Sequence, residues 1–358
     1  MRILFTTHQG GLAGATFSII YLAKGLSERG HDVHIACPKN SLLQDELKEL
    51  EGITCHSIDF AGYFDLGSAR LLAKITSLYK IQLVSPQAGR DRNLAIVAKW
   101  IFGMSAKLIF VRRQRPRDEP WIKRWIHTKA TEKIVMVSNG LKEIFVKKGY
   151  PENYLQVIHN GVDQGEFEEG IDEQERINLR QKLGIGNETV VGCVSRLKYQ
   201  KVLIESLKYL PTDILILFVG IEQKHLNTEI ERERPKQRLV FTGEVARQLM
   251  PLYYSQFDVT VLASQMDGFG LVVVESMLAG VPVVASKFGG IPDIIVDGES
   301  GFLFENSNPK QLAEKIMEIL ENQELRNALI ENAKQRAVDI FSIQATVKKF
   351  EELFQGYA

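Results

Sequence analysis

Residues 264–292 have the sequence SQMDGFGLVVVESMLAGVPVVASKFGGIP. An apolar run ends at Ser264, a glycine-containing loop follows, and a helix is expected from about Leu271 to Leu278. A second apolar run, Pro282–Ser286, follows this helix. A strand, a helix and a second strand in this order form a βαβ unit with two parallel strands.

The same alternation of short apolar runs and helix-length segments extends through the chain. In the first half the expected strands are Arg2–Thr6, Asp32–Cys37, Ile81–Ser85, Lys107–Arg112, Ile134–Ser138 and Gln156–His159; in the second they are Val190–Arg196, Ile214–Gly220, Leu239–Gly243, Val259–Ser264 and Pro282–Ser286. The runs are apolar on both faces, which predicts an α/β fold with two parallel sheets, each covered by helices on both sides.

A chain of 358 residues favours two domains. A polar stretch, Asp163–Ile177, separates the two sets of strands and is the expected interdomain connection. We therefore expect a first domain at 1–164 and a second at 165–340. Helices are expected at 309–321, 324–337 and 343–354, and the C-terminal segment 341–358 is expected to pack back toward the first domain.

The composition is that of a soluble globular protein, with 45% hydrophobic and 25% charged residues. No run of eighteen apolar residues occurs, and the N-terminal stretch MRILFTTHQGG lacks the features of a signal peptide, so we expect a cytoplasmic protein. Cys37, Cys55 and Cys193 have no metal-ligand spacing and are expected to be free thiols.

The net charge of zero hides an asymmetry between the two halves. Residues 1–165 contain 23 Lys and Arg against 15 Asp and Glu, whereas the remainder contains 21 against 29. This difference suggests that the first half faces an anionic partner, such as a phosphorylated acceptor or a membrane surface. The alternative is an ordinary drift in the charge of solvated faces.

Two groups of polar residues follow expected strands, where ligands bind in open parallel sheets. Before the helix at 271–278, the glycine loop and the helix dipole favour an anion, and the carboxylates of Asp267 and Glu275 suit sugar and ribose hydroxyls. After another strand, Arg196 and Lys201 suit a diphosphate. The alternatives are a helix-capping acid with a solvated Glu, and a basic surface loop.

Together these residues resemble the family-four retaining glycosyltransferases of the GT-B fold. The family pattern of Arg-x4-Lys followed by Glu-x7-Glu corresponds here to Arg196…Lys201 and to DGFGLVVVESMLAGVPVVAS, with Asp267 and Glu275 as the acids. Further matches are Gly10-Gly11, SNGLKEIF at 138–145, HNGVD at 159–163, FTGEV at 241–245 and GGIPDIIVDGESGFLF at 289–304. The resemblance covers nearly the whole chain in the family's order, and it implies two Rossmann-like domains whose parallel sheets face each other across a cleft.

The resemblance also implies roles for individual residues in binding a nucleotide-sugar donor. Arg196 and Lys201 would hold the diphosphate, Glu275 the ribose hydroxyls and Asp267 a sugar hydroxyl. The donor would further contact Gly268, Phe269, Gly270 and Leu271 at the helix start, and Gly10 and Gly11 in a loop of the first domain. A tight turn is a second possible role of the glycine pair.

The chain departs from the family pattern at two places. Asp267 stands where the family usually has Glu, which is one methylene longer. Arg112 or Arg113 stands where the family often has His; an arginine stays protonated, so it can bind a phosphate of donor or acceptor but cannot act as a base. His8 is the only other imidazole near the glycine loop, and a structural role is favoured for it.

The resemblance implies retention of anomeric configuration without a protein nucleophile. Arg196, Lys201 and the helix start at Gly270 would stabilise the charge on the leaving phosphate, which would accept the acceptor's proton. No metal and no cofactor are expected, because cationic groups stand where another fold would use Mg²⁺. No nucleic-acid partner is expected.

Residues 112–129, RRQRPRDEPWIKRWIHTK, form a basic segment with two tryptophans. Trp121, Ile122, Trp125 and Ile126 share one helical face, which suits peripheral binding to the anionic inner face of the cytoplasmic membrane. The alternative is a helix that buries its tryptophans.

The sequence therefore predicts a hexosyltransferase that acts on a glycolipid, lipopolysaccharide or polysaccharide acceptor. A nucleotide-sugar epimerase of the same fold and a non-catalytic nucleotide-sugar-binding subunit are the alternatives.

Overall fold

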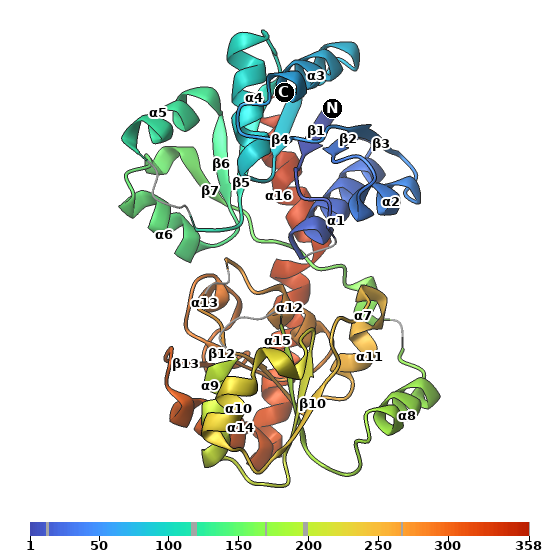
Figure 1. Cartoon of the computed structure of the whole chain (residues 1–358), viewed down its shortest axis with the longest axis vertical. Coiled ribbons are helices and arrows are strands. Elements are labelled where there is room, and N and C mark those ends of the chain that lie inside the picture. Colours follow the sequence, from blue (N-terminus) through green and yellow to red (C-terminus); the bar gives the residue numbers. More distant parts are fainter. Residues whose placement is uncertain (12–13, 116–119, 169, 196–199, 266–267, 358) are drawn as a thin grey trace. The chain divides into compact units, whose positions relative to one another are not determined.

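The computed structural model describes residues 1–11, 14–115, 120–168, 170–195, 200–265 and 268–357. The chain divides into two compact units (Figure 1). Unit 1 contains Met1–Val162 and Ile343–Ala358, and unit 2 contains Asp163–Ser342. Both chain ends therefore belong to unit 1.

Unit 1 is built on a seven-stranded parallel sheet with the strand order β3-β2-β1-β4-β5-β6-β7. Its strands are β1 (Arg2–Thr6), β2 (Asp32–Cys37), β3 (Ile53–Ser57), β4 (Leu83–Pro86), β5 (Lys107–Arg112), β6 (Lys133–Met136) and β7 (Leu155–Val157). The order reverses between β1 and β4. A ligand site is expected at such a switch point, beyond the carboxyl ends of the strands.

The helices of unit 1 are α1 (Gly14–Glu28), α2 (Leu42–Lys48), α3 (Leu66–Leu78), α4 (Gly89–Ile101), α5 (Trp121–Ala130), α6 (Asn139–Lys147) and α16 (Ile343–Gln355). Right-handed crossovers place α1 and α2 on one face of the sheet and α3 to α6 on the other. The C-terminal helix α16 packs beside α1, where Val347 lies so close to Gly25 that a Cβ would meet its Cγ2 at 2.5 Å. Glu351 of α16 accepts a hydrogen bond from Arg29 Nε at 2.7 Å and forms an ion pair with the same guanidinium.

Unit 2 is built on a six-stranded parallel sheet with the order β10-β9-β8-β11-β12-β13. Its strands are β8 (Val190–Val194), β9 (Leu215–Val219), β10 (Arg238–Phe241), β11 (Val259–Leu262), β12 (Val283–Ser286) and β13 (Phe302–Phe304). The order reverses between β8 and β11, so unit 2 has its own switch point.

The helices of unit 2 are α7 (Gly165–Glu168), α8 (Glu173–Lys182), α9 (Lys201–Ser206), α10 (Asn227–Glu233), α11 (Met250–Tyr254), α12 (Leu271–Leu278), α13 (Ile291–Ile294), α14 (Pro309–Glu321) and α15 (Gln323–Phe341). One apolar core lies between the sheet and α9 and α14, and a second between the sheet and α8 and α11. The sheet is thus covered on both faces, as the apolar runs predicted.

The prediction of two parallel α/β sheets is confirmed, and α12 begins and ends where the sequence placed it. Several strands are shorter at their ends than predicted. Two strands were missed: β3 is an edge strand with partly exposed polar residues, and β13 has only three residues. The polar connection at 163–177 contains α7 and the start of α8, which buries only Leu179 and so lacks the apolar stripe that would reveal a helix.

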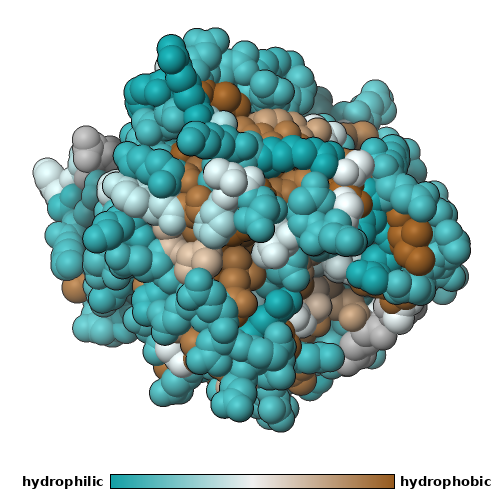
Figure 2. Space-filling model, turned by 90° about the horizontal axis from the view of Figure 1, so that it is seen from below, coloured by the Kyte–Doolittle hydropathy of each residue, from teal (hydrophilic) through white to brown (hydrophobic). Residues whose placement is uncertain are grey.

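The surface is predominantly polar in the view of Figure 2, where apolar residues form small groups among hydrophilic ones. Among the described residues, no helix is both long enough and apolar enough to cross a bilayer. All three cysteines are free, as predicted; Cys37 and Cys193 are buried, whereas Cys55 is half-buried.

Candidate functional site

Lys201 and the start of α12, which carries Glu275, both follow strands at the carboxyl edge of the unit 2 sheet. Ser195 follows β8 and the loop before α12 follows β11, and these two strands are neighbours at the switch point. Lys201 is the exposed first residue of α9. Arg196 and Asp267 lie outside the described residues, so this edge is defined here by Lys201 and by the residues that begin α12.

The start of α12 is fixed by backbone geometry. Gly270 caps the helix with a φ of 107°, in the left-handed region that favours glycine. Phe269 is buried, with its ring centroid 5.7 Å from that of Phe341. Leu271 and Gly268 flank this anchor and are half-buried. The first N–H groups of α12 are therefore held in one orientation at the edge of the sheet.

Glu275, in the middle of α12, is a buried carboxylate with two side-chain partners. Only 3% of the residue is exposed. Arg247 donates a hydrogen bond to its Oε1, and the Tyr254 hydroxyl donates to Oε2 at 2.9 Å. Burial, followed by the charge of Glu275, raises the pKa of Tyr254 well above its ordinary value, so the hydroxyl keeps its proton.

Arg247 links this carboxylate to a second one. Its Nε and Nη2 atoms donate to Oε2 of Glu166 at 3.2 and 3.0 Å. A guanidinium that bridges two carboxylates holds both in defined positions. One lone pair of Oε1 accepts the hydrogen bond from Arg247, and one lone pair of Oε2 accepts that from Tyr254. A carboxylate has about four acceptor positions in total. Acceptor positions therefore remain on both oxygens.

The carboxyl edge of the unit 1 sheet holds a second polar cluster, formed by His8, Gln87, Asp91 and Arg113. These residues follow β1, β4 and β5, the strands at and beside the switch point. His8 Nδ1 lies 2.9 Å from Oδ1 of Asp91. Arg113 Nη1 donates to Oε1 of Gln87 at 2.5 Å. Burial lowers the pKa of Arg113 to about 10, although the charge of Asp91 acts in the opposite direction, so the guanidinium stays charged at neutral pH.

The structure separates the two arginines that were candidates for an acceptor or phosphate site. Arg112 is 5% exposed, and its Nη2 lies 3.0 Å from His127 Nδ1 and 3.4 Å from the Tyr150 hydroxyl. Its guanidinium also lies over the Phe145 ring. Arg112 is therefore part of the packing around α5 and α6, and only Arg113 joins the cluster at the carboxyl edge.

Gly10 and Gly11 differ in their surroundings. A Cβ on Gly10 would meet the Cβ of Ser41 at 2.5 Å, and the Gly10 carbonyl accepts a hydrogen bond from Leu43 N at 3.0 Å. Gly11 is exposed, and a Cβ there would meet nothing within 4 Å. Close packing thus requires a glycine at position 10, whereas Gly11 faces open space.

The tryptophans of α5 are exposed, which overturns the alternative that they are core residues. Trp121, Ile122 and Trp125 are 69%, 52% and 52% exposed, and Ile126 is half-buried. The buried face of α5 consists of His127 and Ala130. Residues 116–119 of the same segment lie outside the described part of the chain.

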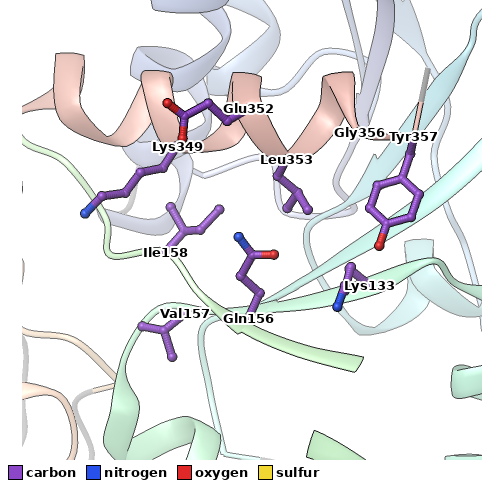
Figure 3. A pocket seen from close by; sticks show the side chains of 9 residues that line it. All are labelled: Lys133, Gln156, Val157, Ile158, Lys349, Glu352, Leu353, Gly356 and Tyr357. Carbon is purple, nitrogen blue, oxygen red and sulfur yellow. The ribbon is translucent and has the colours of Figure 1, made fainter. Parts of the chain in front are cut away.

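A pocket of about 380 Å³ lies between β7 and α16 in unit 1 (Figure 3). Lys133 and Gln156 line it from the amino-terminal part of β6 and β7, and Lys349, Glu352 and Tyr357 line it from α16 and the residues after it. The pocket contains none of the predicted site residues. We therefore do not assign it to the candidate site.

Two known protein families match this chain. Glycosyltransferase Family 4 matches residues 12–166, and Glycosyl transferases group 1 matches residues 175–336. These matches and the two parallel-sheet units show that the chain belongs to the family-four retaining glycosyltransferases of the GT-B fold. It is a glycosyltransferase that uses a nucleotide sugar.

Individual relatives are distant. An uncharacterized glycosyltransferase of Methanocaldococcus jannaschii is 28% identical over 64% of this chain, and the match spans 62% of that protein. The capsular polysaccharide biosynthesis glycosyltransferase CapM of Staphylococcus aureus is 24% identical over 93% of this chain and 92% of its own. The crystal structure of Anabaena HepE in complex with UDP superposes with a TM-score of 0.86 at 22% identity, covering 99% of this chain and all of HepE.

Sequence reasoning missed the partners of the predicted residues. Arg247, Tyr254 and Glu166 surround Glu275 but lie in three other segments of the chain, and Gln87 and Asp91 lie far from His8 in sequence. One signal could have found the second pair. Gln87 directly follows a strand and Asp91 lies in the first turn of the next helix, so both are expected at the carboxyl edge.

Proposed function

We propose that this protein transfers a hexosyl residue from a UDP-sugar, with retention of configuration, to a hydroxyl group of a glycolipid, lipopolysaccharide or polysaccharide acceptor. The observation that carries the proposal is the buried Glu275 carboxylate, oriented by Arg247 and Tyr254 at the switch point of unit 2. UDP is proposed as the nucleotide because HepE, which has the same fold, was crystallised with UDP.

In this proposal the donor binds at the carboxyl edge of unit 2. The remaining lone pairs of Glu275 accept the ribose hydroxyls. Lys201 and Arg196 bind the diphosphate, and the N–H groups of residues 268–271 contact the sugar and phosphates together with Asp267.

Departure of UDP leaves negative charge on the leaving phosphate. The cations of Lys201 and Arg196 and the amino-terminal end of α12 stabilise this charge, so the reaction needs no protein nucleophile and no metal. Gly10 and Gly11 remain donor-binding residues in this proposal, and Gly11 has open surroundings.

The acceptor in this proposal lies at a membrane surface. The exposed Trp121, Ile122 and Trp125 form an apolar face on α5, and Lys129 on the same helix is also exposed. An apolar, tryptophan-bearing face with basic neighbours favours peripheral binding to anionic lipid. The capsular role in the name of CapM supports an envelope glycan as the product.

A screen of UDP-, GDP- and ADP-sugars tests the proposal. At a hundred times its dissociation constant, the correct donor should stabilise the protein by about 2.7 kcal/mol, and the protein should hydrolyse that donor slowly in the absence of an acceptor. Stabilisation without any turnover would favour a non-catalytic binding subunit. Stabilisation by GDP- or ADP-sugars alone would contradict the choice of UDP.

A further inference from the structure

The Asp91 carboxylate at the carboxyl edge of unit 1 is completely buried, and its hydrogen bonds fix its orientation. Oδ2 accepts the backbone N–H groups of Gln87 and Ala88 at 2.8 and 2.9 Å. Oδ1 faces His8 Nδ1 at 2.9 Å. The Thr6 hydroxyl also donates to Oδ2, at 3.5 Å. The two oxygens therefore have different partners: two backbone N–H groups and a hydroxyl at Oδ2, and an imidazole at Oδ1.

This arrangement determines which nitrogen of His8 carries the proton. A carboxylate only accepts hydrogen bonds, so Nδ1 must be the donor and, in the neutral imidazole, Nε2 has the free lone pair. The His8 side chain is 21% exposed, and within the described part of the chain Nε2 has no hydrogen-bond partner. His8 therefore presents a hydrogen-bond acceptor at the edge of the sheet.

Arg113 brings hydrogen-bond donors to the same cluster. Arg113 donates to Gln87 through Nη1, while its buried Nε has no partner among the described residues. Gln87 is in turn held by Ser85, whose Oγ accepts from its amide at 2.9 Å. The cluster thus combines one fixed acceptor with the donors of a fixed guanidinium, a set that matches a hydroxyl group beside an oxygen atom.

We propose that His8 Nε2, in the neutral imidazole, accepts a hydrogen bond from a hydroxyl group of the glycosyl acceptor, and that Asp91 is the positioning residue that holds the ring proton on Nδ1. Arg113 binds an oxygen atom of the same acceptor molecule. The acceptor is therefore recognised through a donating hydroxyl. This inference rests on the proposed function, and it assigns roles in recognising that function's second substrate to His8 and Asp91.

The Asp91→Asn variant tests the positioning role because it should reverse the His8 tautomer. The two backbone N–H groups must still be accepted, so the amide oxygen of the new side chain takes the place of Oδ2 and its NH₂ group faces His8. His8 Nδ1 then accepts, and Nε2 becomes a donor. Two-bond ¹H–¹⁵N spectra of the histidines report this tautomer directly and do not depend on turnover.

The His8→Asn variant tests the binding role. Its amide can still donate to Asp91, but it has no atom in the place of Nε2. The probes are UDP-glucose as donor and a panel of alkyl hexosides as acceptors, with hydrolysis of the donor measured in the same reactions. Loss of one hydrogen bond should lower transfer relative to hydrolysis about tenfold, and the Kd for UDP should not change. The exposed His225, substituted in His225→Asn, is the matched control and also assigns its resonance.

The outcomes separate this inference from the proposed function. A wild type that neither hydrolyses nor transfers from any donor contradicts both. A wild type that hydrolyses UDP-glucose but transfers to no hydroxylated acceptor also contradicts both. A wild-type partition between transfer and hydrolysis in His8→Asn, in contrast, overturns the inference alone. A wild-type spectrum with the proton on Nε2 of His8 overturns it as well.

Discussion

The hydroxyl oxygen of Tyr254 lies 2.9 Å from Oε2 of Glu275, while Arg247 donates to the other oxygen of the same carboxylate. Glu275 is therefore a charged group held in one orientation inside unit 2. Removing one member of such a buried set leaves the others without their partner, which costs more than the loss of an exposed ion pair.

The Glu275→Gln variant should bind UDP about tenfold more weakly and lose about 1–3 kcal/mol of unfolding free energy, because Arg247 loses a buried charged partner. The far-UV spectrum should remain that of the wild type. Calorimetry and chemical denaturation measure the two effects. Glu314→Gln is the control: Glu314 is exposed and pairs with Lys310 at 3.7 Å, and a surface pair contributes little. Equal UDP affinity in the two variants would contradict the donor-site assignment.

Lys201→Ala and Arg196→Ala should each lower kcat/KM about a hundredfold, since each removes a cation proposed to stabilise the leaving phosphate. Lys201 is exposed and lies outside the apolar core, so its removal should leave the melting temperature unchanged. Initial rates of donor hydrolysis provide the measurement. Near-normal turnover in both variants would show that the diphosphate binds elsewhere.

Replacing both Trp121 and Trp125 with Ala should abolish binding to vesicles that contain anionic lipid, because the exposed face of α5 supplies the insertion energy. Both side chains are more than half exposed, so the change in unfolding free energy should stay within about 0.5 kcal/mol. Co-sedimentation and a thermal melt on one sample test this. Tyr209→Ala removes an exposed aromatic residue of unit 2 and should leave vesicle binding intact. Unchanged vesicle binding in the double variant would refute the membrane role of α5.

The reactivity of Cys55 should depend on pH near neutrality. The Sγ atoms of Cys37 and Cys55 lie 3.8 Å apart, and the hydrogen bond from Cys37 lowers the pKa of Cys55 to about 7. Since the thiolate is the nucleophile, alkylation by iodoacetamide should rise as the pH increases through 7. Burial raises the pKa of Cys193 to about 12, so this thiol should not react.

The Cys37→Ala variant isolates the cause of this reactivity. Without the Cys37 thiol as donor, the midpoint of Cys55 alkylation should move up toward the ordinary thiol pKa. Cys193→Ala should leave the midpoint where it is. Mass spectrometry of the alkylated peptides measures both, and an unchanged midpoint in Cys37→Ala would contradict the assigned hydrogen bond.

Local patterns predicted the elements well where the pattern itself determines the structure. The helix at 271–278 was predicted with correct ends because a glycine with a positive φ precedes it and the chain turns at Gly280 after it. The edge strand β3 was missed, since a strand with one exposed edge does not need an apolar sequence. The side chains that orient Glu275 come from distant segments, and no local pattern specifies such contacts.

The sequence predicts in part how the side chains of Arg112 and Arg113 are oriented. Adjacent residues of an extended segment point to opposite faces, so only one of the two could face the carboxyl-edge site. Which one it is depends on the packing of His127 and Tyr150 around Arg112, which the sequence alone does not reveal.

Unit 2 is a continuous insertion within unit 1, and the two unit 1 residues that flank it are hydrogen-bonded to each other. The chain leaves unit 1 after Val162 and returns at Ile343, and the N–H of Ile343 donates to the carbonyl oxygen of Val162 at 2.9 Å. Insertions with adjoining ends can be exchanged without disturbing their host. Residues 163–342 should therefore be exchangeable for the corresponding segment of a relative. We expect the chimaera to use the acceptor of the parent that supplies unit 1 and the nucleotide sugar of the parent that supplies unit 2.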